Sequence, residues 1–225
     1  MVTSQLLSSI PGLRHAFGSA AELVPALLAP VWEQRPAKRQ VHGTRVEHVT
    51  HAQQEVGDAD GFITSAPGIP VSIITADCVP LLLARRDGSQ IAAIHAGWRG
   101  LQDGIIPAGI SAMSALPLAS ASASAPVAAV GPTICVDCYE VSEELAQAFA
   151  SRFGAAAVPR FRHLDLRAIA ELQLRAAGVQ EIEHVGGCTC CKRDAAGAPF
   201  YRSYRRGDRG SQMHSGLYIT PKGEK

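Results

Sequence analysis

The sequence carries almost no net charge. Its 21 basic and 20 acidic residues leave a formal charge of +1. A chain this balanced has no long-range field that would recruit nucleic acid or an anionic membrane. We therefore expect a small-molecule partner, with neither nucleic acid nor a membrane as partner.

Long apolar runs are also missing. The segment LVPALLAPVW is interrupted by Pro25 and Pro30 and falls well short of the roughly 20 residues that cross a bilayer. The first 18 residues lack the basic segment and the small-residue cleavage site of a secretory signal. We therefore expect a cytoplasmic protein. Since 47% of the 225 residues are hydrophobic, residues 1–225 are expected to fold as one domain.

Turn and strand signals concentrate between residues 61 and 96. Four apolar segments there predict an antiparallel set of strands, and Asp87-Gly88 predicts a two-residue turn between the last two. These strands place Cys78 and His95 in one sheet. The four segments are GFIT, IPVSIITAD, PLLLARR and QIAAIHAG.

Helical periodicity appears in three later segments. We expect a helix over 101–116 that breaks or kinks at Pro107, a helix over 142–153 capped by Ser142, and one beginning at Asp165. VAAVGP and IEHVGG predict strands, and residues 118–126 predict a surface loop. Strands and helices do not alternate regularly, which predicts an α+β (mixed α/β) fold with mixed β-sheets flanked by helices.

Three short motifs each supply a side chain that binds borderline-soft metals. QVHG, TADC and HAGWRG contribute His42, Cys78 and His95. Two imidazoles and one thiolate are a ligand set of catalytic zinc sites, which keep a fourth position for water or substrate. The separations of 36 and 17 residues are not a zinc-finger pattern, so a packed cysteine and locally hydrogen-bonded histidines are the alternative.

The neighbours of these residues favour a binding site. Asp77 precedes Cys78, and HAGWRG places two glycines beside a Trp-Arg pair, where the backbone can approach a partner closely. Arg99 can hold an oxyanion or phosphate through two parallel hydrogen bonds. Its alternative is an exposed arginine packed on Trp98.

Together these motifs resemble the laccase-domain family, also called the YfiH or multicopper polyphenol oxidase family. The resemblance covers roughly residues 40 to 219, and TADC paired with HAGWRG is highly specific to the family. It implies one domain of mixed sheets with a zinc ion on His42, Cys78 and His95. The segments that carry it are QVHG, DADGFITSAPGIPVSIITADCVPLLL, AAIHAGWRG, VGPTICVDCYEV and SYRR.

The resemblance also implies an activity. Members are associated with phosphorolysis of purine nucleosides such as inosine, guanosine, adenosine and methylthioadenosine, with adenosine deamination as a second reaction. The older family label is copper-dependent oxidation of phenols. This chain departs from the family in a short segment before QVHG and in Gly210, Ser211 and Gln212, where relatives carry a TGR-like turn.

Chemistry distinguishes these activities. A multicopper oxidase needs many histidines in paired spacings, but this chain has eight histidines and no such pair. Copper binding remains possible at a site of nitrogen and sulfur ligands, yet zinc suits nucleoside chemistry better. We predict Arg99 as phosphate ligand and Asp77 as a general acid-base or as the group that orients a zinc-bound histidine. Arg45 and Arg205 are further predicted anion ligands, and a homodimer is possible.

Two hydrolases are rival interpretations. A looser resemblance extends to bacterial cytotoxic necrotizing factors, in which Cys78 would be a nucleophile and His95 its base. Editing of peptidoglycan precursors, a hydrolysis at a nucleotide-linked amino acid, would use the same arginines. Tight stoichiometric zinc would argue against a nucleophilic cysteine.

The other cysteines form a separate pattern. Cys135-x-x-Cys138 and Cys188-x-x-Cys191 have the spacing of a structural zinc site, with Cys190 as a fifth thiol. Six cysteines in a cytoplasmic chain are more typical of thiols or metal ligands than of disulfides. A four-cysteine zinc site and a group of neighbouring free thiols both fit the spacing.

Overall fold

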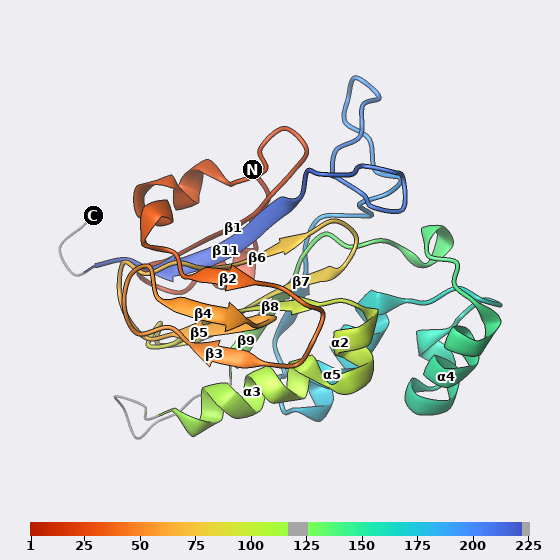
Figure 1. Ribbon diagram of the computed structural model, residues 1–225, viewed down its shortest axis with the longest axis horizontal. Helices are drawn as coiled ribbons and strands as arrows, with labels where there is room; N and C mark the ends of the chain where they lie inside the picture. The colour runs from red at the N-terminus through yellow and green to blue at the C-terminus, as the bar shows by residue number, and fades with distance from the viewer. Residues whose placement is uncertain (117–125, 222–225) are drawn as a thin grey trace.

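A six-stranded mixed sheet lies at the centre of the computed structural model, which describes residues 1–116 and 126–221 (Figure 1). The β3/β5 and β10/β9 pairs are parallel, and the three central pairings are antiparallel. In spatial order the strands are β10 (Ile182–His184), β9 (Pro126–Val130), β7 (Val79–Arg85), β8 (Ile91–Ala96), β5 (Gly61–Thr64) and β3 (Val46–His48).

Both faces of this sheet are buried. In β7, Leu81 and Leu83 pack in one apolar cluster, whereas Leu82 and Ala84 pack in the other, because successive side chains of a strand point to opposite faces. Helices cover the first face, as Figure 1 shows below the sheet. These helices are α2 (Trp98–Asp103), α3 (Ile105–Ala115) and α5 (Leu166–Ala176); Phe149 of α4 (Glu143–Phe153) joins the same cluster.

A three-stranded antiparallel sheet covers the second face (Figure 1). Its central strand is β11 (Met213–Ile219), which pairs with β1 (Leu13–Phe17) on one side and β6 (Val71–Thr75) on the other. The smaller elements are the parallel pair β2 (Ala37–Arg39) and β4 (Glu55–Asp58), helix α1 (Gln5–Ser8), and the 3-10 helices η1 (Ala26–Gln34), η2 (Val136–Cys138) and η3 (Ala155–Ala157).

This arrangement confirms a mixed α/β single domain with mixed sheets and flanking helices. The predicted helix ends are also observed. The Ser142 hydroxyl accepts a hydrogen bond from the Leu145 N–H, and the Asp165 carboxylate accepts two at the start of α5. Gly178 adopts φ +89° just after α5, which glycine tolerates without steric cost.

Three sequence predictions were wrong in detail. Strand β6 pairs with β11 in the second sheet, so only β5, β7 and β8 form the predicted antiparallel set. The helix break falls at Gly104, with φ +93°, while Pro107 lies in the first turn of α3, where a missing N–H costs nothing. The hairpin loop spans 86–89, since Arg85 N–H bonds to the Gln90 carbonyl.

Among the described residues, no helix combines the length and apolar character needed to span a membrane. The predicted loop at 118–126 falls almost wholly outside those residues.

Candidate functional site

A cavity of about 720 Å³ lies where β6 ends, β7 begins and β8 ends. This volume is in the range of small-ligand pockets, roughly 300–1,000 Å³. Its lining combines the three predicted metal ligands with cations and aromatic rings. It includes Lys38, Gln40, His42, Asp77, Cys78, His95, Trp98, Arg99, Tyr139, Tyr204, Arg205 and Gln212.

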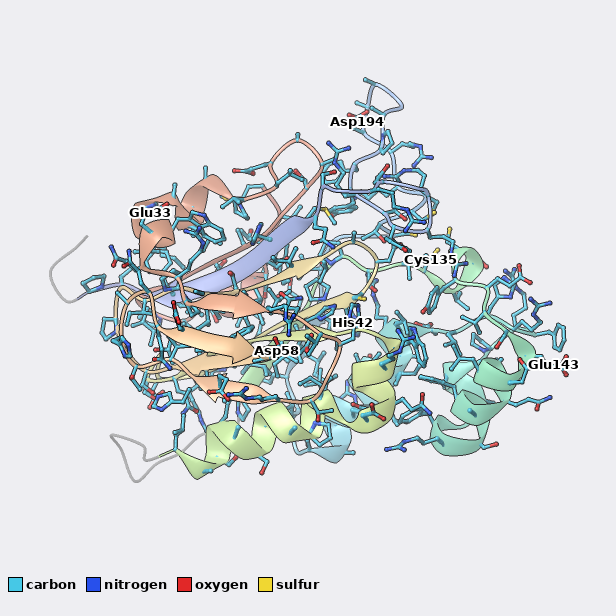
Figure 2. All side chains as sticks on the ribbon, viewed as in Figure 1. Glu33, His42, Asp58, Cys135, Glu143 and Asp194 are labelled. Atoms are coloured by element: carbon cyan, nitrogen blue, oxygen red, sulfur yellow. The ribbon has the colours of Figure 1, made fainter. Side chains whose placement is uncertain are left out.

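The structure brings His42, Cys78 and His95 together. One donor atom from each lies within 4.8 Å of the others, and the two imidazole rings meet edge to face with centroids 4.7 Å apart. The β7/β8 pairing places His95 opposite Pro80, two residues after Cys78. His42 comes from the loop between β2 and β3 and lies at this end of the sheet (Figure 2).

Asp60, which lies just before β5, holds this group in place. Its buried carboxylate accepts hydrogen bonds from the backbone N–H groups of Val41, His42 and Gly43 at 2.8–3.1 Å. It also accepts one from His95 Nδ1 at 2.7 Å. Because Nδ1 donates to Asp60, His95 Nε2 is left to face Cys78 and the cavity.

Asp60 is ionised in this setting. Burial alone would raise its pKa, but the hydrogen bonds from His95, Gly43 and Val41 outweigh burial and hold the pKa below its usual value. Sequence reasoning predicted Asp77 for the orienting role and missed Asp60. The one local sign of Asp60 in the sequence is that an aspartate directly precedes the apolar strand GFIT, in DADGFIT.

Cys78 and His95 shift each other's protonation. Burial would raise the pKa of Cys78, but positive charge on His95 and hydrogen bonds from His42 and His95 lower it to about 6. Burial would lower the pKa of His95, but the Cys78 thiolate and Asp60 raise it to about 9. The pair is therefore thiolate and imidazolium at neutral pH, and one proton must leave His95 before both can coordinate a metal.

The donor set suits zinc. Imidazole nitrogen and cysteine sulfur are the ligands that zinc prefers, and three protein ligands leave one coordination position for another group. The same soft donors also accept copper. The residues present therefore fit a single borderline-soft ion at this cluster.

Gly97 supplies the close approach that its motif predicts. A Cβ atom at this position would lie 2.9 Å from His42 Cδ2 and 3.0 Å from Cys78 Sγ, distances at which one side chain must move.

We expect Gly97→Ala to lower zinc affinity about 10–100-fold, because the new methyl group displaces two ligands. Gly43→Ala is the matched control, since its Cβ would meet Asp60 Oδ2 and Val41 Cγ2 at 3.7 Å, an ordinary contact distance. Competition with a chelator of known affinity measures both variants. Equal zinc affinity in Gly97→Ala and Gly43→Ala would contradict the role of Gly97 in leaving room for His42 and Cys78.

Asp77 lies in the cavity wall but contacts neither histidine. Its Oδ1 accepts from the Thr189 hydroxyl at 2.6 Å, its Oδ2 from the Arg205 N–H at 2.8 Å, and its carbonyl from the Thr133 hydroxyl at 2.6 Å. The φ of +97° is a strained value for a residue with a Cβ, of a kind that clusters at functional sites. The hydrogen bond to a predicted histidine ligand is therefore made by Asp60, and general acid-base work stays a prediction for Asp77.

The predicted arginines differ in their placement. Arg99 lies in the cavity wall with its guanidinium 4.3 Å from the Trp98 ring centroid. Arg205 also lines the cavity, and its guanidinium donates to the carbonyls of Cys138 and Glu140. Arg45 lies outside the cavity lining and pairs with Glu47 on the surface at 2.6 Å, so its position gives no support to an anion-binding role.

Sequence reasoning also missed Lys38 and Tyr139. The Lys38 ammonium is buried in the cavity wall, 4.2 Å from the Phe62 ring centroid, and has no hydrogen-bond partner among the described residues. Burial raises the pKa of Tyr139 to about 12, so its hydroxyl stays protonated. Lys38 lies outside the family segments, whereas Tyr139 lies within VGPTICVDCYEV, where nothing local shows that its side chain faces the cavity.

Known proteins match this chain over most of its length. Purine nucleoside phosphorylase from Xylella fastidiosa (strain Temecula1) is 34% identical over 182 residues, covering 76% of this chain and 68% of the relative. Purine nucleoside phosphorylase YfiH from Escherichia coli (strain K12) is 30% identical over 195 residues, covering 84% and 74%.

Solved structures share the fold. The crystal structure of Neisseria meningitidis protein NMB0706 superposes with a TM-score of 0.75 at 26% identity, covering 98% of this chain and 99% of that one. YlmD from Geobacillus stearothermophilus gives 0.72 at 27% identity, covering 87% and 76%. The family described as multi-copper polyphenol oxidoreductase laccase matches residues 21–218, and this chain belongs to it.

Proposed function

We propose that this protein is a zinc-dependent purine nucleoside phosphorylase that also deaminates adenosine. The observation that carries the proposal is one cavity that combines the His42, Cys78 and His95 cluster with three aromatic side chains and Arg99, which has no carboxylate partner among the described residues. The names of relatives at 30–39% identity, purine nucleoside phosphorylase, support the phosphorylase part of this proposal. Expected substrates are inosine, guanosine, adenosine and methylthioadenosine with phosphate.

Phosphorolysis needs a cation that holds phosphate beside the ribose. Within residues 1–116 and 126–221, the Arg99 guanidinium has no carboxylate partner, and it lies over the Trp98 ring, 4.3 Å from the ring centroid. A guanidinium held in this way presents two parallel N–H donors to phosphate oxygens. In the reaction a phosphate oxygen bonds to ribose C1′ while the bond from C1′ to the purine breaks, and its electron pair leaves on the base.

The remaining lining groups can hold the nucleoside. Trp98, Tyr139 and Tyr204 offer aromatic faces for a purine ring. The Asp77 carboxylate, already fixed by Thr189 and Arg205, keeps free lone pairs that can accept from a sugar hydroxyl or a base N–H. A zinc ion held by His42, Cys78 and His95 would supply Lewis acidity, the chemistry that adenosine deamination needs.

Polyphenol oxidation is the competing family label. A laccase-type reaction uses a blue copper centre together with a nearby copper cluster. Among the described residues, one metal-ligand cluster contains histidine, and it offers three ligands around a single position. This ligand count favours nucleoside chemistry, although copper binding at the same three side chains remains chemically possible.

A Cys-His hydrolase is the second proposal that a specific observation favours. The Cys78 thiolate beside the His95 imidazolium is the charge state of an activated cysteine nucleophile. A thiolate bound to zinc is a poor nucleophile, so the zinc content of the purified protein separates the two functions.

Chromatography of products tests the phosphorylase proposal. Adenosine and inosine are incubated with the protein, with and without phosphate, and we expect release of free base that depends on phosphate. Cys78→Ala should abolish it. Arg99→Met should raise KM for phosphate about 10–100-fold, the equivalent of one charged hydrogen-bonding group. Arg45→Met, a surface control, should leave KM unchanged.

Two results would contradict this proposal. No conversion of either nucleoside would favour the Cys-His hydrolase or a hydrolase of peptidoglycan precursors. Base release that persists unchanged in Cys78→Ala would place the reaction away from the cluster.

A further inference from the structure

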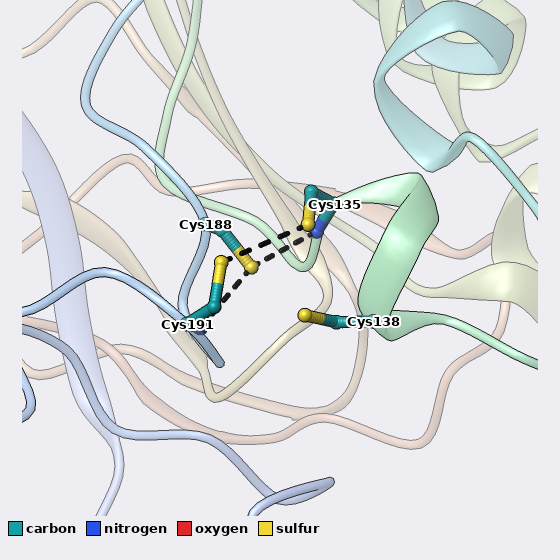
Figure 3. A group of neighbouring side chains, drawn as sticks. All are labelled: Cys135, Cys138, Cys188 and Cys191. Carbon is teal, nitrogen blue, oxygen red and sulfur yellow. Dashed lines mark hydrogen bonds between the residues drawn. The ribbon is translucent and has the colours of Figure 1, made fainter.

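We propose that Cys135, Cys138, Cys188 and Cys191 bind a structural zinc ion, separate from the His42, Cys78 and His95 cluster. This inference does not depend on the proposed activity, because it rests on the four thiols and their surroundings alone. The four side chains come from η2 with the residue before it and from a loop some 50 residues later in the chain (Figure 3).

The sulfur positions fit a tetrahedral ion. All four Sγ atoms lie within 4.8 Å of one another, and those of Cys135 and Cys191 are 4.0 Å apart. Zinc to sulfur bonds of about 2.3 Å place sulfurs about 3.8 Å apart in a tetrahedron. The sulfurs therefore need to approach by at most about 1 Å, which side-chain rotation supplies.

Backbone groups already stabilise negative charge on the cluster. Cys188 Sγ accepts hydrogen bonds from the N–H of Cys135 at 3.2 Å and of Cys191 at 3.4 Å, as Figure 3 shows. The bond from the Cys191 N–H to Cys188 Sγ joins the two ends of the Cys188-x-x-Cys191 turn. Zinc binds thiolates rather than thiols, so donors aimed at sulfur favour the metal-bound form.

Arginines surround the cluster. Arg206 donates to the carbonyls of Thr189 and Cys190, Arg193 donates to the Cys190 carbonyl, and Arg205 donates to the Cys138 carbonyl. Four thiolates around one divalent ion carry a net charge of −2, which Arg193 and Arg205 offset in part, whereas Arg206 also pairs with Asp208.

Such an ion would fasten one wall of the cavity. Thr133, two residues before Cys135, and Thr189, directly after Cys188, both donate their hydroxyls to Asp77, the first to its carbonyl and the second to its carboxylate. The Thr189 N–H also bonds to the Thr133 carbonyl at 3.1 Å. The zinc ion therefore cross-links two loops that both hydrogen-bond to Asp77.

Cys190 provides the matched control. It lies between two proposed ligands in the sequence, yet its sulfur is outside the cluster of four and packs against the apolar cluster that includes α5. A substitution at Cys190 therefore alters a thiol in the same loop without removing a ligand.

Metal analysis tests the proposal on protein purified under reducing conditions without chelator. We expect about two zinc ions per chain in the parent and in Cys190→Ala, and about one in Cys78→Ala and in the double variant Cys135→Ser/Cys191→Ser. One zinc ion in the parent, lost in Cys78→Ala, would overturn the proposal. Iron in place of zinc would overturn the metal assignment.

A second measurement covers the case in which the double variant does not fold. Cobalt replaces zinc in the Cys78→Ala variant, which keeps all four proposed ligands. We expect the strong thiolate-to-cobalt absorption of a tetrahedral four-sulfur site. Absence of that absorption, or an intact mass showing two disulfides in the reduced preparation, would contradict the site.

Discussion

Asp60→Asn should release zinc from the cavity cluster and destabilise the whole domain. The substitution replaces an acceptor of four hydrogen bonds with an amide whose NH₂ group faces other donors. Loss of a group that orients a metal-bound histidine costs about 10–100-fold in metal affinity. Breaking a fully buried charged pair costs about 3–5 kcal/mol of unfolding free energy.

Asp58→Asn is the control for this experiment. Asp58 lies two residues earlier and pairs with Arg39 at the surface, with 43% of its side chain exposed. An exposed pair of this kind contributes at most about 1 kcal/mol. Zinc content and urea denaturation measure both variants. If Asp60→Asn retained parental zinc affinity and stability, the orienting role assigned to Asp60 would be wrong.

Lys38→Met should stabilise the protein strongly at neutral and acidic pH. Burial lowers the pKa of Lys38 from 10.5 to about 7; Asp60 raises it and Arg35 lowers it further. His214 also faces Lys38, but burial lowers the pKa of His214 to about 4, so it carries no charge at neutral pH. The unfolded chain therefore binds a proton at Lys38 that the folded chain releases between pH 7 and 10.5.

The unfolding free energy of the parent therefore rises with pH in this range, because the unfolded chain binds more protons than the folded chain. Folding of the parent is least favourable below pH 7, where Lys38 must be buried with its charge, and improves as the pH rises toward 10.5. The pKa difference corresponds to about 5 kcal/mol. We therefore expect Lys38→Met to raise the unfolding free energy by about 3–5 kcal/mol at pH 6, and by less than about 1 kcal/mol at pH 10.

Lys192→Met is the control, because Lys192 is exposed and also lies over aromatic rings, those of Phe200 and Tyr201. It should change stability by no more than about 0.5 kcal/mol at either pH. A stability gain in Lys38→Met that does not depend on pH would mean that the folded and unfolded chains bind the same number of protons at Lys38, and would contradict the lowered pKa.

Local signals explain what the sequence could predict. Helices α4 and α5 have an apolar period and capping residues, Ser142 and Asp165, that act on atoms only a few residues away. Cys78 and His95 belong to one hairpin, so their approach is also a short-range property. The family motifs added His42, whose approach to the other two no local pattern indicates.

Long-range contacts explain what the sequence could not predict. The apolar run of β6 is compatible with either sheet, and its partner β11 lies about 140 residues away. Asp60 acts mainly through backbone N–H groups, which carry no residue identity. The sequence alone does not distinguish Arg45 from Arg99 as an anion ligand. The structure does, because Arg45 pairs with Glu47 whereas Arg99 lies over Trp98.

The position of β11 has a consequence for synthesis of the chain. Among the described strands it is synthesised last, yet it is the central strand of its sheet and pairs with β1, about 200 residues earlier. Contacts of such high sequence separation form slowly, because a long loop must close before they contribute. Until then β1 and β6 each expose an unpaired edge that other chains can join. A new chain is therefore more prone to aggregate until β11 has been synthesised and has paired with both strands.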